Sequence, residues 1–175
     1  MLRNINTALV TNNFRYVTVS FSDHLGSTRN IKALVDCGSS KTCMSFDLYS
    51  KFLSYLPIDI DQRIIVKGYT GKKLSSLGSI PFVFRLNNSS VMHHVQVIPG
   101  VSHQLLIGMD FITAFSGIID TRHELFHFRD SLRNNQSVPM YKHDEMTQQF
   151  KVTSTMNLIV PGKSEVISSR YFVIL

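Results

Sequence analysis

The sequence predicts an all-β protein, mostly antiparallel sheet, with one or two short helices. Apolar residues recur at every second position in short segments along most of the chain, and turn-forming residues separate these segments. Only two short segments have helical features. With 43% hydrophobic and 17% charged residues, the chain has enough apolar surface to fold. Its 175 residues allow one domain with an appendage.

The N-terminal part predicts a β-hairpin that leads into an aspartate. Residues 15–21 place apolar side chains on one face, turn formers fill 22–27, and residues 31–35 alternate again. The second strand therefore runs directly into Asp36. After a Gly-Ser loop, residues 41–44 predict a short strand, and Ser45 can cap a helix that Pro57 ends.

The central part predicts two more pairs of strands. Residues 63–67 and 72–77 are extended arms, and Gly68 and Gly71 frame a short tip between them, which is typical of a hairpin that can bend. Residues 80–86 and 91–98 form the next pair around a polar turn. A short apolar strand at 104–108, a helix at 109–115, and a hairpin of residues 117–120 and 125–128 follow.

The ends differ in composition from this central part. We expect an N-terminal arm at 1–13, a domain at 14–130, a polar linker at 131–150 and a C-terminal strand pair at 151–175. The strand pair flanks Pro161 and Gly162 and is too short for a core of its own.

Charge and hydropathy exclude several classes of protein. The net charge is +6, but the basic residues are scattered, so a nucleic-acid partner is not expected for this domain. Apolar runs are far shorter than the roughly 20 residues of a membrane-spanning helix, and no secretory signal is visible. We expect no membrane partner, and a location in the cytoplasm or within an assembled particle. Cys37 and Cys43 have no further ligands at zinc-binding spacing.

The segment that carries chemistry is Ala33-Leu34-Val35-Asp36-Cys37-Gly38-Ser39-Ser40. A charge delivered by a hydrophobic strand into a Gly-Ser loop is costly unless the charge has a function. Alternatively, Asp36 caps a turn through its side-chain oxygen, as aspartates before glycine often do. The octet by itself leaves both interpretations open.

Together with two later segments, this octet resembles the retropepsin family, the aspartic proteases of retroviruses and long-terminal-repeat retrotransposons, over roughly residues 14–130. Residues 33–39 look like the catalytic segment of that family, and residues 66–77 fall where it has its flap. Residues 105–111 look like its second signature. The matching site residues are Asp36, Cys37, Gly38 and Ser39 in the loop; Val66, Lys67, Gly68, Tyr69, Thr70 and Gly71 in the flap; and Leu106, Ile107, Gly108 and Asp110 in the signature.

The resemblance implies a closed barrel that works as a twofold homodimer. Enzymes of this family hydrolyse peptide bonds with two aspartates that share one proton. This sequence has one Asp-x-Gly segment, and neither Asp110 nor Asp120 sits in a second such loop. The resemblance therefore implies that Asp36 of each chain meets at a twofold axis. It implies an extended peptide or polyprotein as substrate, and residues 151–175 could begin the next polyprotein region.

One residue departs from the family pattern. Where the family has Thr or Ser after the catalytic aspartate, this sequence has Cys37, and a thiol is a weaker hydrogen-bond donor. The alternative function is therefore a catalytically impaired protease-like domain that dimerises or binds peptides. A cysteine nucleophile with a histidine base has no supporting spacing. We expect no cofactor and no metal, because the histidines lie in strand or hairpin patterns.

Overall fold

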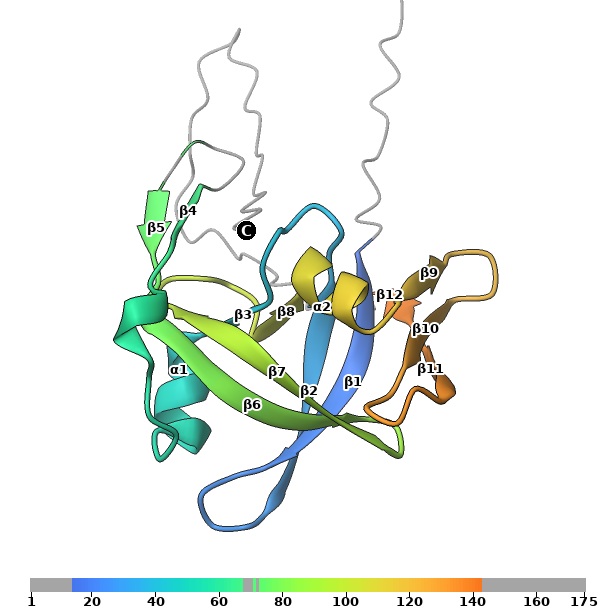
Figure 1. Cartoon of the computed structure of the whole chain (residues 1–175), viewed down its shortest axis with the longest axis horizontal. Helices are drawn as coiled ribbons and strands as arrows, with labels where there is room; N and C mark the ends of the chain where they lie inside the picture. Colours follow the sequence, from blue (N-terminus) through green and yellow to red (C-terminus); the bar gives the residue numbers. More distant parts are fainter. Residues whose placement is uncertain (1–13, 68–70, 72, 143–175) are drawn as a thin grey trace, which may run out of the picture.

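The structure is a computed structural model that describes residues 14–67, 71 and 73–142. Its main element is a closed barrel of six strands (Figure 1). In barrel order these are β1 (Arg15–Ser22), β2 (Thr28–Val35), β8 (Leu105–Ile107), β3 (Cys43–Ser45), β7 (Ser89–Ile98) and β6 (Gly78–Leu86). The barrel closes where β6 pairs with β1, at Leu86 opposite Val19. The predicted all-β class is confirmed.

The first hairpin forms as the alternation predicts. β1 and β2 pair antiparallel along their whole length, from Arg15 opposite Val35 to Ser22 opposite Thr28. On β1 the apolar side chains at every second position are fully or almost fully buried, while Thr18 between them is exposed. Burial of one face is what fixes this register, because a slip of one residue would expose the apolar set.

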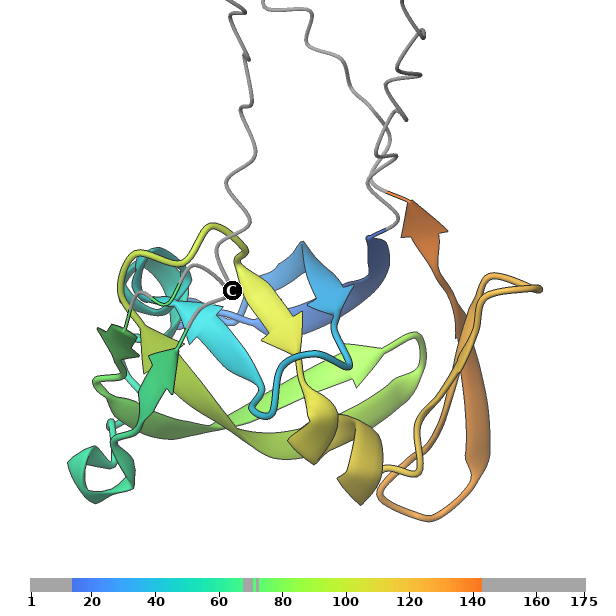
Figure 2. The same cartoon turned by 90° about the horizontal axis from the view of Figure 1, so that it is seen from above.

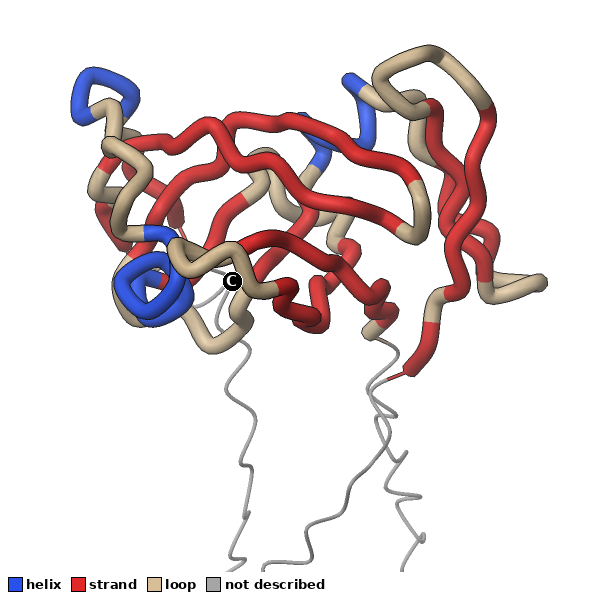
Figure 3. Tube along the Cα trace, turned by 90° about the horizontal axis from the view of Figure 1, so that it is seen from below, coloured by secondary structure: helices blue, strands red, loops and turns tan. Residues whose placement is uncertain are grey.

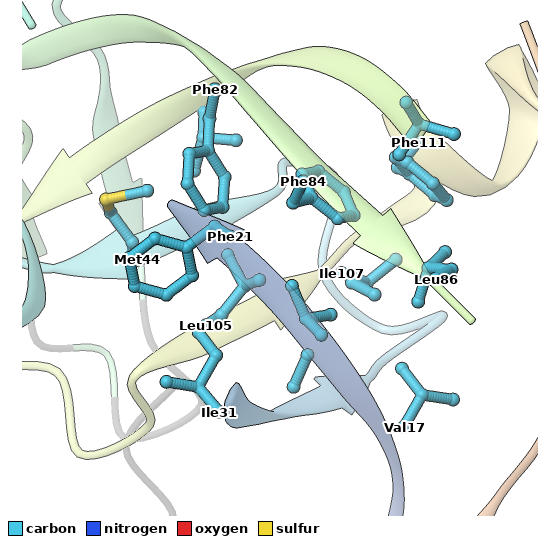
Figure 4. Close-up of a cluster of buried hydrophobic side chains, with 14 of the residues drawn as sticks. Val17, Phe21, Ile31, Met44, Phe82, Phe84, Leu86, Leu105, Ile107 and Phe111 are labelled. Carbon is cyan, nitrogen blue, oxygen red and sulfur yellow. The ribbon is translucent and has the colours of Figure 1, made fainter. Parts of the chain in front are cut away.

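The barrel core is built from aromatic and branched aliphatic side chains of opposing strands. Phe82 and Phe84 of β6 point into it beside Phe21 and Met44 (Figure 4). The Phe21 and Phe82 ring centroids are 5.4 Å apart, an edge-on contact, and Phe84 contacts Phe111 at 5.7 Å. These contacts join three elements that are distant in sequence, so the core holds the barrel closed.

Short helical segments connect the strands. Ser45 begins the first one as predicted, because its hydroxyl accepts a 3.1 Å hydrogen bond from the Leu48 amide. This segment consists of α1 (Phe46–Leu48) and a wider turn, η1 (Tyr49–Leu53). A short 3-10 turn, η2 (Ile60–Gln62), precedes the flap. The helix α2 (Met109–Ala114) follows β8 directly. No helix in the part of the chain that the structure describes is long and apolar enough to cross a membrane.

Both arms of the predicted flap hairpin are present as strands. β4 (Ile65–Lys67) pairs antiparallel with β5 (Lys73–Ser75), with Val66 opposite Leu74. The hairpin stands at one side of the barrel (Figure 1). Its predicted tip residues Gly68, Tyr69 and Thr70 lie outside the described residues, as do the predicted arm at 1–13 and the strand pair at 151–175.

A second sheet stands at the opposite side of the barrel (Figures 2 and 3). It consists of β9 (Ile118–Asp120), β10 (Leu125–Arg129) and β11 (Asn135–Pro139), all antiparallel. β12 (Tyr141–Lys142) then returns to pair with the start of β1. The expected linker over 131–150 is therefore wrong for residues 135–139 and 141–142, which form strands, and its remainder at 143–150 lies outside the described residues. Val138 and Met140 are buried and attach this polar segment to the core.

Candidate active site

Asp36 directly follows the buried strand β2, as the sequence predicts. β2 runs parallel to β8, with Val35 opposite Ile107, and the Asp36 amide continues this ladder with a 3.0 Å hydrogen bond to the Ile107 carbonyl. The backbone of Asp36 is thus fixed by the barrel itself. A side chain held this way has a defined direction without the help of other side chains.

The residues that follow, 36–42, form what we call the Asp36 loop. The Gly38 amide donates a 2.8 Å hydrogen bond to Asp36 Oδ1, and the Ser39 amide approaches the Asp36 carbonyl at 3.3 Å. A Cβ on Gly38 would lie 3.1 Å from Asp36 Oδ1, so this close turn favours glycine. Asp36 Oδ2 is buried and has no hydrogen-bond donor among the described residues. One carboxylate oxygen is thus held by the loop, and the other is unsatisfied.

The two cysteines of this region have opposite environments. Cys37, directly after Asp36, is exposed, whereas Cys43 on β3 is buried. Burial, with the nearby negative charges of Asp110 and Asp36, raises the pKa of the Cys43 thiol to about 12. Cys43 is therefore an inert core residue.

The second signature lies directly against the Asp36 loop. Leu106 and Ile107 are buried on β8, and Gly108 packs so closely that a Cβ there would lie 2.5 Å from the Lys41 carbonyl carbon. The Met109 amide donates a 2.8 Å hydrogen bond to the Ser39 carbonyl. Only glycine permits this approach, which brings two segments distant in the sequence into backbone contact.

Asp110, at the start of α2, holds the far end of the Asp36 loop. Its Oδ1 accepts hydrogen bonds from the Thr42 amide (2.8 Å), the Thr42 hydroxyl (2.7 Å) and the Phe111 amide (2.8 Å). The Thr42 hydroxyl in turn accepts a 3.0 Å bond from the Gly108 amide. Asp110 is thus a structural anchor.

The environment of Asp110 keeps it ionised. Burial by itself would raise the pKa of Asp110, but its contacts with His93, Thr42 and the Phe111 amide outweigh that effect and lower it. No local sequence pattern marks Thr42 or His93 as a partner of Asp110.

A groove runs between the Asp36 loop and the first arm of the flap. It has a volume of about 330 Å³ and is lined by residues 38–41 of the loop, by Cys43 and Ile98, and by residues 64–67 of the flap arm. We call it the flap groove. It brings together four predicted loop and flap residues: Gly38, Ser39, Val66 and Lys67. Its aliphatic walls and its exposed strand β4 suit an extended chain with apolar side chains.

A second cavity, of about 400 Å³, shares Lys41 with the flap groove. The residues that line it are all polar or charged: Lys41, Asp59, Gln62, Ser79, His93, His94, Gln96 and Asp110. We call it the polar cavity. His93 on β7 is mostly buried there, whereas its neighbour His94 is exposed. The polar cavity therefore adjoins the Asp110 anchor.

The histidines of the second sheet lie in a hairpin, as expected. His123 Nδ1 is 2.7 Å from Asp120 Oδ2, and this contact lowers the pKa of Asp120 to about 2. His127 Nδ1 lies 2.7 Å from the Ser137 hydroxyl. Among residues 14–67, 71 and 73–142, no group of three or more histidine, cysteine or acidic side chains is arranged to hold a metal ion.

Comparison with solved structures places this arrangement in a known fold. The structure is similar to the retroviral protease-like domain of Ddi1 from Leishmania major, with a TM-score of 0.59 and 16% sequence identity. The match covers 78% of this chain and 100% of that one. No family model and no curated protein matches the sequence. The barrel, the flap hairpin and the Asp36 loop between them thus make up a retropepsin-like fold.

Proposed function

We propose that the chain is an aspartic endopeptidase that assembles its active site from two copies. The observation that carries this proposal is the Asp36 carboxylate, held at the end of a buried strand with Oδ1 bound to the Gly38 amide and Oδ2 buried without a donor among the described residues. An unsatisfied buried carboxylate oxygen is costly, and a second carboxyl group that shares a proton would satisfy it.

The second carboxyl group comes from the partner copy. The other aspartates near the Asp36 loop or in the second sheet are engaged: Asp110 holds Thr42, and Asp120 pairs with His123. A twofold dimer that brings the two Asp36 side chains together completes the site with one carboxylate from each chain.

The pair performs general acid and base catalysis. Two carboxylates about 3 Å apart cannot both ionise cheaply, so they titrate as a unit with one shared proton. The ionised member takes a proton from water, which attacks the scissile carbonyl. The protonated member donates to the carbonyl oxygen. When the tetrahedral intermediate collapses, the carboxyl group that took the water proton gives it to the leaving amine, and the other carboxylate takes back a hydroxyl proton of the intermediate. The pair again holds one shared proton.

The substrate is an extended peptide. In the flap groove it lies beside residues 64–67 and above the Asp36 loop, with aliphatic walls for alternate side chains. Closure of the flap over the peptide would exclude water from the reacting bond. The resemblance to retroelement proteases suggests a polyprotein as the natural substrate.

The second candidate is a protease-like domain that dimerises or binds peptides without cleaving them. Cys37 favours it, because the residue beside Asp36 is exposed and carries a thiol, a weak donor, where a hydroxyl would bond across the dimer axis. Weaker contacts between the two copies at the dimer axis lower both the dimer affinity and the cleavage rate.

Cleavage is tested with a diverse peptide library and mass spectrometry of the products, at mildly acidic and neutral pH with a reductant. We expect the chain to cut a subset of peptides, and Asp36→Asn to abolish cutting. Asp47→Asn, which changes an exposed aspartate on α1, is the matched control and retains activity. Equal product patterns for the wild type and Asp36→Asn would disprove catalysis at this site.

Binding and dimerisation separate the two candidates. We expect sedimentation to give a dimer, and a peptide with a statine-type alcohol at its centre to bind the wild type more tightly than Asp36→Asn, because the alcohol mimics the tetrahedral intermediate. Peptide binding without any cleavage supports the second candidate. A rise in activity or dimer affinity in Cys37→Thr supports the missing hydroxyl as the cause; an unchanged variant rejects it.

A further inference from the structure

His93 is a polar group in the wall of the polar cavity that catalysis does not use. Its Nε2 is buried and lies 3.4 Å from Asp110 Oδ2, an ion-pair distance but long for a hydrogen bond. The ring packs edge-on against Phe111 at 5.4 Å and Phe115 at 6.2 Å. His93 is thus confined between an aromatic surface and one carboxylate.

Asp110 uses its two oxygens differently. Oδ1 is saturated by Thr42 and the Phe111 amide, so Oδ2 is the oxygen that His93 faces. The orientation that presents Oδ1 to Thr42 is therefore the one that presents Oδ2 to His93. Any attraction between His93 and Asp110 favours the orientation that holds the Asp36 loop.

A donor at position 93 strengthens that attraction. An N–H donated to an ionised carboxylate makes a charge-assisted hydrogen bond, roughly twice as strong as a neutral one. Asp110 is ionised because its contacts lower its pKa. A ring N–H of His93 that faces Oδ2 therefore stabilises the orientation in which Oδ1 binds Thr42.

We propose that His93 is a positioning residue for the Asp36 loop: it fixes the Asp110 carboxylate, which holds Thr42, at the end of the loop, next to Gly108. This role concerns how the loop is held, so it does not depend on whether the chain cleaves peptides.

Other charged groups near His93 come from three elements. Lys41 of the Asp36 loop, Asp59 before η2 and His94 on β7 line the same polar cavity. None of these three forms a side-chain ion pair within 4 Å with His93 among the described residues, whereas Asp110 does. Asp110 is therefore the group through which His93 acts.

Amide hydrogen exchange at Thr42, Gly108 and Met109 tests the lock, because these three amides donate to Asp110, to Thr42 and to Ser39. The full chain with Asp36→Asn is used throughout as the parent, so that peptide cleavage plays no part. Protection factors of the parent and of variants at position 93 are compared at one pH. We expect protection at these amides to fall about five-fold when position 93 loses its hydrogen-bond donor, the size of a partly exposed pair of about 1 kcal/mol.

Three added variants complete the test. His93→Gln keeps a hydrogen-bond donor, so its protection at the three amides should stay near that of the parent. His93→Phe keeps a ring but has no donor, so it should be about five-fold less protected. His94→Gln, on the same strand and in the same cavity, should behave like the parent. Parent-like protection in His93→Phe, or the same loss in His93→Gln as in His93→Phe, overturns the proposal; His93→Leu, which also lacks a donor, replaces His93→Phe if that variant does not fold.

A kinetic readout distinguishes this proposal from the proposed function. If the wild-type background cleaves a peptide, kcat should fall in His93→Phe and be largely kept in His93→Gln, with KM little changed. If it cleaves nothing, the proposed protease activity fails while the exchange result still decides the role of His93.

Discussion

Asp110 accepts two hydrogen bonds from Thr42 through a single oxygen, at 2.8 Å from the amide and 2.7 Å from the hydroxyl. The two residues are 68 positions apart. The Thr42 hydroxyl also accepts a bond from the Gly108 amide, so one side chain acts as donor and acceptor between two segments. This small network holds the Asp36 loop against the start of α2.

Replacing Thr42 by valine should destabilise the fold strongly. Thr42→Val keeps the shape but removes two hydrogen bonds and leaves the buried Gly108 amide without a partner. An unsatisfied buried amide together with the lost charge-assisted hydrogen bond to Asp110 should lower the free energy of unfolding by about 2 to 3 kcal/mol. Urea denaturation gives the free energy of unfolding. Thr28→Val, at an exposed strand position, should change it by less than about 0.5 kcal/mol; equal effects would contradict the network.

Gly108 should tolerate alanine far less than Gly100 does. A Cβ on Gly108 meets the Lys41 backbone at 2.5 Å, so the two segments must move apart, at a cost of about 3 kcal/mol. Gly100 has a φ of +76° but open space around it, so alanine there costs only the backbone strain, about 1 kcal/mol. Thermal or urea unfolding of both variants checks the order, and a smaller loss at Gly108 would contradict it.

Asp23 should contribute to the loss of stability in acid. Its fully covered carboxylate accepts bonds from the Leu25 and Ser27 amides (both 2.9 Å) and from Arg29 Nε (2.7 Å). Burial opposes ionisation, but these bonds outweigh it and lower the pKa of Asp23. Because the folded-state pKa is the lower one, Asp23 stabilises the fold above the ordinary aspartate range, and this contribution is lost as the pH falls through the lowered pKa.

Urea midpoints at neutral pH and at about pH 3 measure this contribution. We expect Asp23→Asn to be less stable than the wild type at neutral pH and to lose less stability on acidification. Asp47→Asn changes an exposed aspartate and should keep the wild-type slope. Identical slopes for the two variants would show that Asp23 is not a source of acid sensitivity.

The parts of the fold that the sequence predicts are those with strong local contrast. On β6 the apolar residues alternate with exposed ones, and Phe82, Phe84 and Leu86 are buried as that pattern requires. Asp36 is predictable for the same reason, because a charge after three apolar residues stands out. Its role as one half of a shared pair stays a prediction.

Other features depend on contacts that no local pattern encodes. β11 and β12 are mostly polar, and their backbone groups are satisfied by β10 and β1, so composition predicts a linker there. Only Val138 and Met140, two positions apart and both buried, signal a strand. The bond between Asp110 and Thr42 joins residues far apart in sequence, and a helix-start aspartate has a sufficient local explanation without it.

The two cysteines should differ sharply in reactivity. Only the thiolate is nucleophilic, and Cys43 is both buried and held protonated by its raised pKa of about 12. Cys37 is exposed beside Asp36. We expect iodoacetamide at about pH 8 to alkylate Cys37 in the native chain and to reach Cys43 only after unfolding.

Mass spectrometry of native and urea-treated samples gives the number and position of the labels. Cys37→Ser should show no label until urea is added, and Cys43→Ser should show one label in either condition. Rapid native labelling of Cys43 would contradict a closed barrel around β3.

The same native samples, oxidised mildly without alkylation, test the proposed dimer, because two copies that meet at Asp36 also bring their Cys37 thiols together. A disulfide-linked dimer that disappears in Cys37→Ser is the expected result, and a chain that stays monomeric on a non-reducing gel argues against that axis.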